Sequence, residues 1–325
     1  MSRPKVQVTR EVFDEVLDYL GQHFEVTANQ QDRPFTPEEL AQALVDKQGA
    51  LTVLTDRIDE ALIARCPQLK AVCNIAVGYN NFDLKAMSAR GVVGTNTPGV
   101  LDAATADFTW ALILATARRL TEAEAWLRAG EWQGWKLKQF LGMDVQGATL
   151  GIIGMGRIGQ AVAKRAHGFD MPVLYYNRTR LAPALERDCH ARHASLDELL
   201  AQSDVVTLHT PYSADSHHLI GAVQLAKMKP SAILIHAARG GVVDDAALIA
   251  ALRNGTIAAA GLDVFENEPK FNPEFLKLRN VVLAPHIASA TTNTRRNMAM
   301  LAAKNLVAAL TGARPPNLLN PDALK

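Results

Sequence analysis

The stretch from Leu150 to Gly159 reads Leu-Gly-Ile-Ile-Gly-Met-Gly-Arg-Ile-Gly. An apolar run typical of a buried strand leads into three glycines at Gly-x-Gly-x-x-Gly spacing, and a helical pattern follows. In that setting Gly154 permits a tight turn, Gly156 lets a phosphate approach the backbone, and Gly159 lets the helix pack on the strand. The stretch predicts a dinucleotide phosphate site at the start of a helix, with a purely structural turn as the alternative. The residues expected at this site are Gly154, Gly156, Arg157, Ile158 and Gly159.

Around this loop, short apolar runs alternate with amphipathic stretches along most of the chain. Such alternation predicts the α/β class, with parallel sheets covered by helices on both faces. The expected strands cover residues 6–8, 51–54, 71–75, 150–153, 173–176, 205–208, 233–235 and 281–283. The expected helices cover residues 11–20, 37–46, 157–167 and 244–253.

The length of 325 residues exceeds one ordinary hydrophobic core, so two domains are expected. A helical pattern over residues 101–129 is long enough to bridge two domains, although a plain buried helix has the same pattern. Another helix is expected over residues 291–310. If that helix returns to the N-terminal sheet, the first domain is discontinuous. It then covers residues 1–100 plus 290–325, and the second domain covers residues 101–289.

Composition indicates an ordinary globular protein, because 48% of the residues are hydrophobic and 21% are charged. A net charge of +1 gives no sign of nucleic-acid or acidic-membrane binding. The N-terminal residues do not resemble a secretion signal, and no apolar run reaches the roughly 18 residues of a membrane span. The three cysteines have no disulfide or metal spacing, and His217 and His218 have no metal-ligating neighbours. We therefore expect a cytoplasmic protein with reduced cysteines, both histidines at the surface, and no nucleic-acid or membrane partner.

The strand expected at residues 173–176 ends in a basic turn. An NAD site usually has an acidic residue at this point, which binds the ribose hydroxyls. This chain has Asn177, Arg178, Thr179 and Arg180 instead. Two guanidinium groups and two neutral polar groups suit a 2′-phosphate, through charge-assisted hydrogen bonds. The turn predicts a preference for NADP(H), with NAD(H) as the lesser cofactor; the alternative is a basic turn exposed to solvent.

Three chemically useful side chains follow apolar strands late in the chain. Arg239 follows the strand at 233–235, and its planar guanidinium matches a carboxylate with a neighbouring carbonyl oxygen. His286 follows the strand at 281–283, and an imidazole can protonate an oxygen while hydride reaches the carbonyl carbon. An ionised Glu268 near the ring would favour the imidazolium form and orient it. Ordinary surface or structural roles are the alternatives for each, but together the three residues predict hydride transfer to a small oxo acid.

Five motifs, in this order and spacing, resemble the D-isomer-specific 2-hydroxyacid dehydrogenase family over nearly the whole chain. They are the glycine loop and the stretches at 77–83, 238–244, 261–269 and 285–291. Within the family, the tract at 129–135 and the basic turn are similar to those of glyoxylate/hydroxypyruvate reductases, including the type that accepts 2-ketogluconate. The resemblance implies two Rossmann-like parallel-sheet domains: a flavodoxin-like substrate domain and a doubly wound NAD(P)-binding domain.

The resemblance also implies catalytic roles at matching positions. Arg239 would hold the substrate carboxylate and carbonyl, His286 would be the acid/base, and Glu268 would tune it. The backbone N–H groups of Val77 and Gly78 would bind the substrate carboxylate as well.

Further positions would contact the cofactor or a second subunit. The family members are commonly homodimers paired through the cofactor domains, and Trp135 would then reach the active site of the partner subunit. The additional residues implied at the cofactor are Thr105, Thr210, Pro211, Ala237, Asp263 and Ser289.

These expectations together describe an NADPH-preferring reductase of short 2-oxo acids. The candidate reactions are glyoxylate to glycolate, hydroxypyruvate to D-glycerate, and reduction of 2-ketogluconate. One alternative is a D-2-hydroxyacid dehydrogenase for a larger substrate. An alternative of another class is a dinucleotide-sensing, corepressor-like binding protein, because such proteins share the fold and the catalytic trio.

Overall fold

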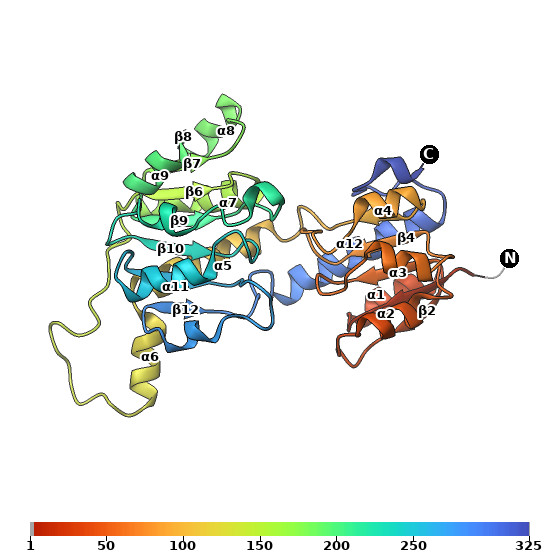
Figure 1. The fold of residues 1–325 in the computed structure, drawn as a ribbon, viewed down its shortest axis with the longest axis horizontal. Helices are drawn as coiled ribbons and strands as arrows, with labels where there is room; N and C mark the ends of the chain where they lie inside the picture. The colour runs from red at the N-terminus through yellow and green to blue at the C-terminus, as the bar shows by residue number, and fades with distance from the viewer. Residues whose placement is uncertain (1–2, 325) are drawn as a thin grey trace. The chain divides into compact units, whose positions relative to one another are not determined.

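The computed structural model describes residues 3–324, which form two compact units. The first unit contains the chain up to Leu101 together with the chain from Ala290 onward, and the second contains Asp102–Ser289. Each unit has one parallel sheet with helices packed on it (Figure 1). The predicted α/β class, with two parallel-sheet domains, is confirmed.

The sheet of the first unit has the strand order β2-β1-β3-β4-β5, which is the flavodoxin-like order. Its strands are β1 (Lys5–Val8), β2 (Glu25–Ala28), β3 (Gly49–Thr52), β4 (Ala71–Asn74) and β5 (Val93–Thr95). Its helices are α1 (Asp14–Gly21), α2 (Pro37–Leu44), α3 (Glu60–Arg65), α4 (Leu84–Ala89), α12 (Thr292–Leu310) and the 3-10 turn η4 (Pro321–Leu324).

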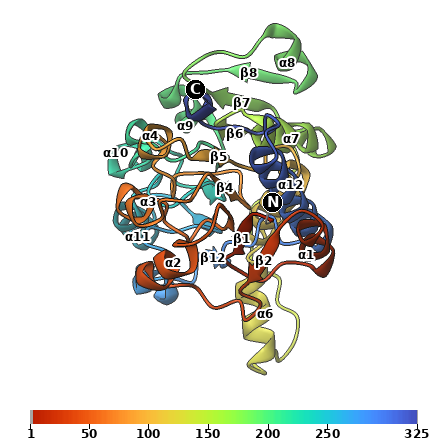
Figure 2. The ribbon, with the colours of Figure 1, turned by 90° about the vertical axis from the view of Figure 1, so that its right-hand side faces the viewer.

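Helix α12 completes the first unit from the far end of the chain. It packs against β3, β4 and α1, and Figure 2 shows it beside α1 at this sheet. Gly49 in β3 explains the close approach, because a Cβ there would lie 2.7 Å from Leu306 Cδ1 and 2.9 Å from Leu310 Cδ1. The N-terminal sheet is therefore covered by a segment almost 200 residues beyond its last strand.

The sheet of the second unit has the strand order β12-β11-β10-β9-β6-β7-β8. The chain leaves β6 in one direction through β7 and β8 and then resumes on the other side with β9, so a topological switch point lies between β6 and β9. The strands are β6 (Leu150–Ile153), β7 (Val173–Tyr176), β8 (Ala191–His193), β9 (Val205–Leu208), β10 (Ile233–His236), β11 (Ala259–Leu262) and β12 (Val281–Leu283).

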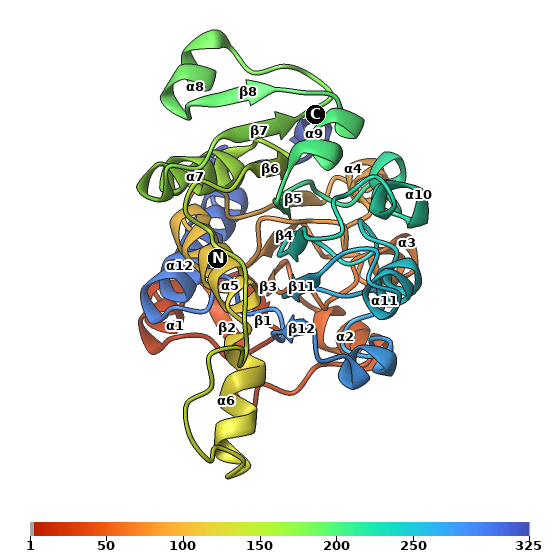
Figure 3. The same ribbon diagram turned by 90° about the vertical axis from the view of Figure 1, so that its left-hand side faces the viewer.

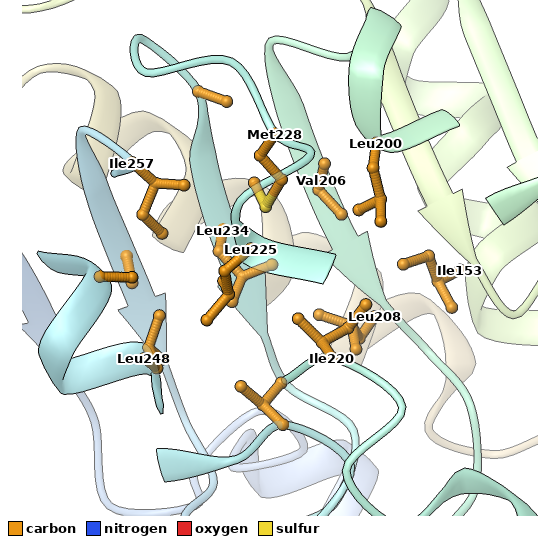
Figure 4. Packing of buried hydrophobic residues seen from close by; sticks show 14 of the residues in the cluster. Ile153, Leu200, Val206, Leu208, Ile220, Leu225, Met228, Leu234, Leu248 and Ile257 are labelled. Carbon is orange, nitrogen blue, oxygen red and sulfur yellow. The ribbon is translucent and has the colours of Figure 1, made fainter. Parts of the chain in front are cut away.

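Helices on the second sheet bury two apolar clusters. One cluster joins β6, β9 and β10 to the following helices, and Figure 4 shows Ile153, Val206 and Leu234 among its members. The helices are α5 (Asp102–Ala117), α6 (Leu120–Arg128), α7 (Arg157–Ala166), α8 (Pro183–Asp188), α9 (Leu196–Gln202), α10 (Ala222–Leu225) and α11 (Asp245–Arg253). The 3-10 turns are η1 (His167–Phe169), η2 (Ala214–Ser216) and η3 (Pro273–Lys277).

The prediction of one long helix over residues 101–129 is wrong. Arg119, at the junction of α5 and α6, has a left-handed φ of 51°, which ends the first helical axis. Helix α5 is the plain buried helix of the alternative, packed on β10, β11 and α7 inside the second unit. Figure 3 shows α6 and the loop that follows it projecting away from this sheet.

Several predicted boundaries also needed correction. Strand β3 covers Gly49–Thr52 rather than residues 51–54, and strands β2, β5 and β8 had no predicted counterpart. The apolar strand expected before Glu268, for which no range was predicted, is β11. Among residues 3–324, no helix has the length and apolarity that would carry it across a bilayer. The same residues contain no cluster of three or more side chains arranged to hold a metal ion.

Candidate active site

The glycine loop lies between β6 and α7, where the backbone leaves little room for side chains. Gly154 has a φ of +98°, and a Cβ there would lie 2.7 Å from the Thr210 nitrogen. A Cβ on Gly159 would lie 2.4 Å from the Gly154 carbonyl oxygen, so the helix could not pack this closely. A Cβ on Gly156 would meet nothing within 4 Å, and no side chain caps the helix there. Gly154 and Gly159 are therefore required by the close packing of the backbone. Gly156 instead leaves open space at a helix N-terminus, which suits a phosphate.

A cleft of about 400 Å³ opens beside this loop at the switch point of the sheet. Such a position, outside the carboxyl ends of the strands, is where parallel α/β sheets bind ligands. The predicted residues that line it are Gly154, Gly156, Asn177, Arg178, Thr179, Thr210 and Pro211. The lining residues that were not predicted are Met155, Tyr176, His209, Ser213, Asp215, Ser216 and Leu219. The lining contains the residue types that a dinucleotide needs: glycines, neutral polar groups and a cation.

The basic turn after β7 is less positive than its sequence suggests. Arg178 Nη1 lies 2.9 Å from the Asp215 carboxylate, with both side chains largely exposed at 80% and 76%. Arg180 binds Glu186 through two hydrogen bonds of 2.8 and 2.9 Å and does not line the cleft. That contact, with the Tyr175 hydroxyl, lowers the pKa of Glu186 to about 2. Each arginine of the turn therefore already has a carboxylate partner.

Arg239, Glu268 and His286 follow three adjacent strands, β10, β11 and β12. Because the strands are parallel, their carboxyl ends share one edge of the sheet. His286 Nδ1 and Glu268 Oε2 are 2.8 Å apart, and both side chains are about one-quarter exposed. Arg239 is half-buried, and the charge of the nearby Glu268 partly offsets the lowering of its pKa by burial. The structure thus brings the three predicted side chains together.

Glu268 is held by both of its oxygens. Oε2 faces His286, and Oε1 accepts a 2.7 Å hydrogen bond from the Phe265 N–H. Burial raises the pKa of Glu268, but the hydrogen bond and charge of His286 outweigh it, so the pKa lies below its ordinary value. Glu268 is therefore ionised at neutral pH and fixes the orientation of the imidazole ring.

Asp263 anchors the loop that carries His286. Its carboxylate is fully buried and accepts hydrogen bonds from the N–H groups of Ile287 at 2.7 Å and Ala288 at 2.9 Å. Its carbonyl oxygen accepts a 2.9 Å hydrogen bond from the His286 N–H. His286 itself has a left-handed φ of 57°, a costly conformation that these bonds hold in place. Asp263 was predicted at the cofactor, and that stays a prediction; the contacts shown here are with the loop that carries His286.

In the first unit, Val77 and Gly78 lie in the loop after β4. Asn96 donates a 2.7 Å hydrogen bond to the Val77 carbonyl, and Asn74 donates a 3.0 Å hydrogen bond to the Gly78 carbonyl. Within residues 3–324 no acceptor is recorded for the N–H group of either residue. The loop is therefore fixed through its carbonyl groups while both N–H donors stay available to a ligand.

The region from residue 110 to residue 288 matches the family model described as the NAD binding domain of D-isomer specific 2-hydroxyacid dehydrogenase. This chain belongs to the D-isomer-specific 2-hydroxyacid dehydrogenase family. Membership makes it an NAD(P)-dependent oxidoreductase, with the second unit as its nicotinamide dinucleotide-binding region. The predicted family is thus confirmed.

Curated members of the D-isomer-specific 2-hydroxyacid dehydrogenase family align end to end with this chain. The glyoxylate reductase of Thermococcus gammatolerans is 49% identical over 327 residues, covering 99% of this chain and 98% of that protein. The glyoxylate reductase of Aeropyrum pernix is 47% identical over 331 residues, covering 100% and 98%.

Solved structures of 2-hydroxyacid dehydrogenases are also similar to this chain over nearly its whole length. A putative D-isomer specific 2-hydroxyacid dehydrogenase from Polaromonas has a TM-score of 0.91 and 36% identity, covering 98% of this chain and 100% of that one. The NADPH-dependent glyoxylate/hydroxypyruvate reductase of Sinorhizobium meliloti, solved with NADP and malonate, has a TM-score of 0.87 and 33% identity. It covers 99% of this chain and 98% of that one.

The remaining predicted residues occupy varied places. Thr105 and Ala237 are buried, and Ser289 is half-buried at the end of the second unit. Trp135 is 78% exposed in the loop after α6. His209 is a cleft residue that sequence reasoning missed. Its Nδ1 is buried with no hydrogen-bond partner among residues 3–324, and burial lowers its pKa to about 3. Its position directly after the predicted strand at 205–208 is the signal that could have identified it.

Proposed function

We propose that this dehydrogenase reduces short 2-oxo acids, glyoxylate foremost, with NADPH as its preferred cofactor. The observation that carries the proposal is the 2.8 Å contact between His286 and an ionised Glu268, beside the half-buried Arg239. A cation for a carboxylate and an imidazole for a carbonyl oxygen are the two groups that 2-oxo acid reduction requires.

Arg239 would capture the substrate. The Arg239 side chain donates from Nη1 to the Ala238 carbonyl at 2.7 Å, which fixes its orientation. The other guanidinium N–H groups can then bind the carboxylate and the adjacent carbonyl oxygen as a planar pair. The free N–H donors at Val77 and Gly78 support the further proposal that they too bind a substrate carboxylate.

His286 would deliver the proton. Its Nδ1 is engaged by Glu268, so Nε2 is the nitrogen left for the substrate oxygen. When bound, the nicotinamide supplies the hydride. As charge develops on the substrate oxygen, His286 donates its proton there, and the Glu268 carboxylate stabilises the imidazolium before the transfer.

Substrate and cofactor choice rest on the relatives and on the basic turn. Curated relatives near 49% identity are named glyoxylate reductases, and the Sinorhizobium meliloti structure is named an NADPH-dependent glyoxylate/hydroxypyruvate reductase. We therefore propose glyoxylate, then hydroxypyruvate and 2-ketogluconate. Preference for NADPH is supported by Arg178 on the cleft wall and opposed by Asp215, its ion-pair partner.

We also propose a cytoplasmic homodimer paired through the second unit. Large apolar side chains are exposed on α6 and its following loop, which supports burial against another subunit. These residues are Leu120, Leu127, Trp132, Trp135, Leu137 and Leu141. The three buried, unpaired cysteine thiols are consistent with a reducing compartment.

A substrate panel tests the proposal. The purified protein is mixed with NADPH or NADH and with glyoxylate, hydroxypyruvate, 2-ketogluconate or larger 2-oxo acids, and absorbance at the nicotinamide band is followed. We expect the highest kcat/KM with glyoxylate or hydroxypyruvate and NADPH. Higher activity on bulky 2-oxo acids would favour the larger-substrate dehydrogenase. Tight NADPH binding without turnover of any acid would favour the corepressor-like binding protein.

A further inference from the structure

A second imidazole–carboxylate pair lies close in sequence to the catalytic one. His218 Nε2 is 2.5 Å from the Glu266 Oε1 atom, and both side chains are partly buried. Glu266 precedes Glu268 by two residues in the loop after β11, and His218 lies between β9 and β10. His218 was expected at the surface, and its side chain is 37% exposed. Its contact with Glu266 was not expected, because the two residues are 48 positions apart and no local pattern links them.

The backbone of His218 binds the loop that carries Arg239. Its N–H donates a 2.8 Å hydrogen bond to the Gly241 carbonyl, and its φ of 50° is left-handed. Two residues later the Ile220 N–H donates to the Val242 carbonyl at 3.1 Å. His218 thus contacts the Arg239 loop through its main chain and the Glu268 loop through its side chain.

The two catalytic loops touch each other directly. A Cβ on Gly240 would lie 1.8 Å from the Phe265 carbonyl oxygen, so the two backbones are in contact with no side chain between them. Phe265 also donates its N–H to Glu268. If either loop moves, the other must move as well, because the contact between them is backbone against backbone.

Carboxylates surround the His218 ring. Its Nδ1 is 3.8 Å from Asp244 Oδ2, and Asp245 Oδ2 accepts a 3.1 Å hydrogen bond from the Glu266 N–H. The Glu266 hydrogen bond, together with the charges of Glu266, Asp244 and Asp245, raises the pKa of His218. The ring of His217, also ionisable, stacks on that of His218 with 3.9 Å between the ring centroids.

The segment that carries His218 also forms the wall of the cofactor cleft. Ser213, Asp215, Ser216 and Leu219 all line that cleft. We propose that His218 is a positioning residue that links the cleft wall to the two loops carrying Arg239 and Glu268. This inference rests on the proposed function, because it assigns His218 to the alignment of the 2-oxo acid site when the cofactor cleft is filled.

His218→Gln tests the link, since glutamine can still donate a hydrogen bond to Glu266 but carries no charge. We expect kcat/KM for glyoxylate to fall about tenfold or more at pH 6, as misplacement of catalytic groups does. The dissociation constant of NADPH, measured by fluorescence, should change less than threefold. His217→Gln is the matched control, because His217 is exposed and, among residues 3–324, its ring has polar or stacking contacts with Tyr212 and His218 but none with a carboxylate.

The pH profile separates positioning from a merely structural role. The folded pKa of His218 is raised, so its charge is fully present at low pH and is lost as pH rises through that value. The ratio of wild-type to His218→Gln kcat/KM should therefore be largest at low pH and approach one at high pH. A ratio that stays constant with pH, or an equal loss of NADPH affinity, would overturn the inference.

A second variant covers the case in which His218→Gln does not fold. Glu266→Gln removes the same charge pair from the other side and should give the same pH-dependent ratio; wild-type kcat/KM at every pH would overturn the link. In the wild type, NMR titration should show the His218 ring deprotonating at higher pH than in Glu266→Gln, and equal titration would also contradict it. The proposed function fails separately, if the wild type itself reduces no 2-oxo acid.

Discussion

At the scale of single residues, the contact between His286 and Glu268 leads to a direct test of the proposed proton transfer. His286→Ala removes the proposed proton donor, and we expect kcat for glyoxylate to fall by about two orders of magnitude or more. Glu268→Gln retains a hydrogen-bonding group but loses the charge, so its kcat should fall less. Steady-state assays at pH 7 with saturating NADPH measure both. Near-normal turnover of His286→Ala would remove this residue from the mechanism.

We expect cofactor selectivity to depend on whether Arg178 binds Asp215 or a 2′-phosphate, because the Asp215 carboxylate already pairs with its guanidinium. Asp215→Asn frees Arg178 for a 2′-phosphate, so the ratio of kcat/KM for NADPH over NADH should rise about two- to fivefold, the scale of an exposed ion pair. Arg178→Asp should lower the ratio by about tenfold or more.

Asp188→Asn is the control for this selectivity, since Asp188 pairs with Lys164 on the surface and does not line the cleft. Its ratio should match that of the wild type. If Arg178→Asp leaves the ratio unchanged, the basic turn is only a solvated surface feature.

Arg239 and His286 could be predicted because each lies three residues after an apolar strand, and parallel strands bring their carboxyl ends to one edge. Glu268 lies six residues after the weaker strand β11. The residues that hold the loops of the trio in place could not be predicted in this way. Asp263 holds the N–H groups of Ile287 and Ala288, 24 and 25 residues away, and His218 reaches Glu266 over 48 residues. Contacts of this kind depend on how loops meet in space, which no local sequence pattern encodes.

At the scale of elements, the strands that were predicted from the sequence are mostly the ones buried on both faces. Strands β6 and β9 are buried on both faces and therefore appear as continuous apolar runs. Strands β2 and β8 are half-exposed edge strands with polar residues, and neither was predicted. Strand β11 consists of Ala-Ala-Gly-Leu, which has low strand propensity and is a strand because β10 and β12 flank it.

The junction of β6 and α7 gives a prediction that separates folding from binding. Gly156→Ala adds a methyl group in open space at a φ of −77°, so its thermal midpoint should stay within about 2 °C of the wild type. The methyl would occupy the space needed by a pyrophosphate, so the NADPH dissociation constant should rise about tenfold or more. Gly168→Ala, also in open space but away from the cleft, should change neither quantity. Unchanged NADPH affinity in Gly156→Ala would place the phosphates elsewhere.

At the scale of the whole molecule, the two units differ in strand order but share one architecture, because each is a parallel sheet with helices packed on it. The residues proposed for proton transfer and cofactor binding all lie in the second unit, together with the exposed apolar residues of α6 and its loop. The homodimer proposed above would bury this exposed apolar surface of the second unit.

Trp135 supplies the test of that pairing. If it completes the active site of the partner subunit, Trp135→Ala alone and His286→Ala alone should both be impaired, while sedimentation still shows dimers. In a mixed dimer, one site has both substitutions, whereas the other has an intact His286 and receives the intact Trp135 of its partner. Random exchange of equal amounts should therefore restore about a quarter of wild-type sites, as two-fold symmetry requires. If mixing gives only the average of the two separate activities, Trp135 acts within its own chain or not at all.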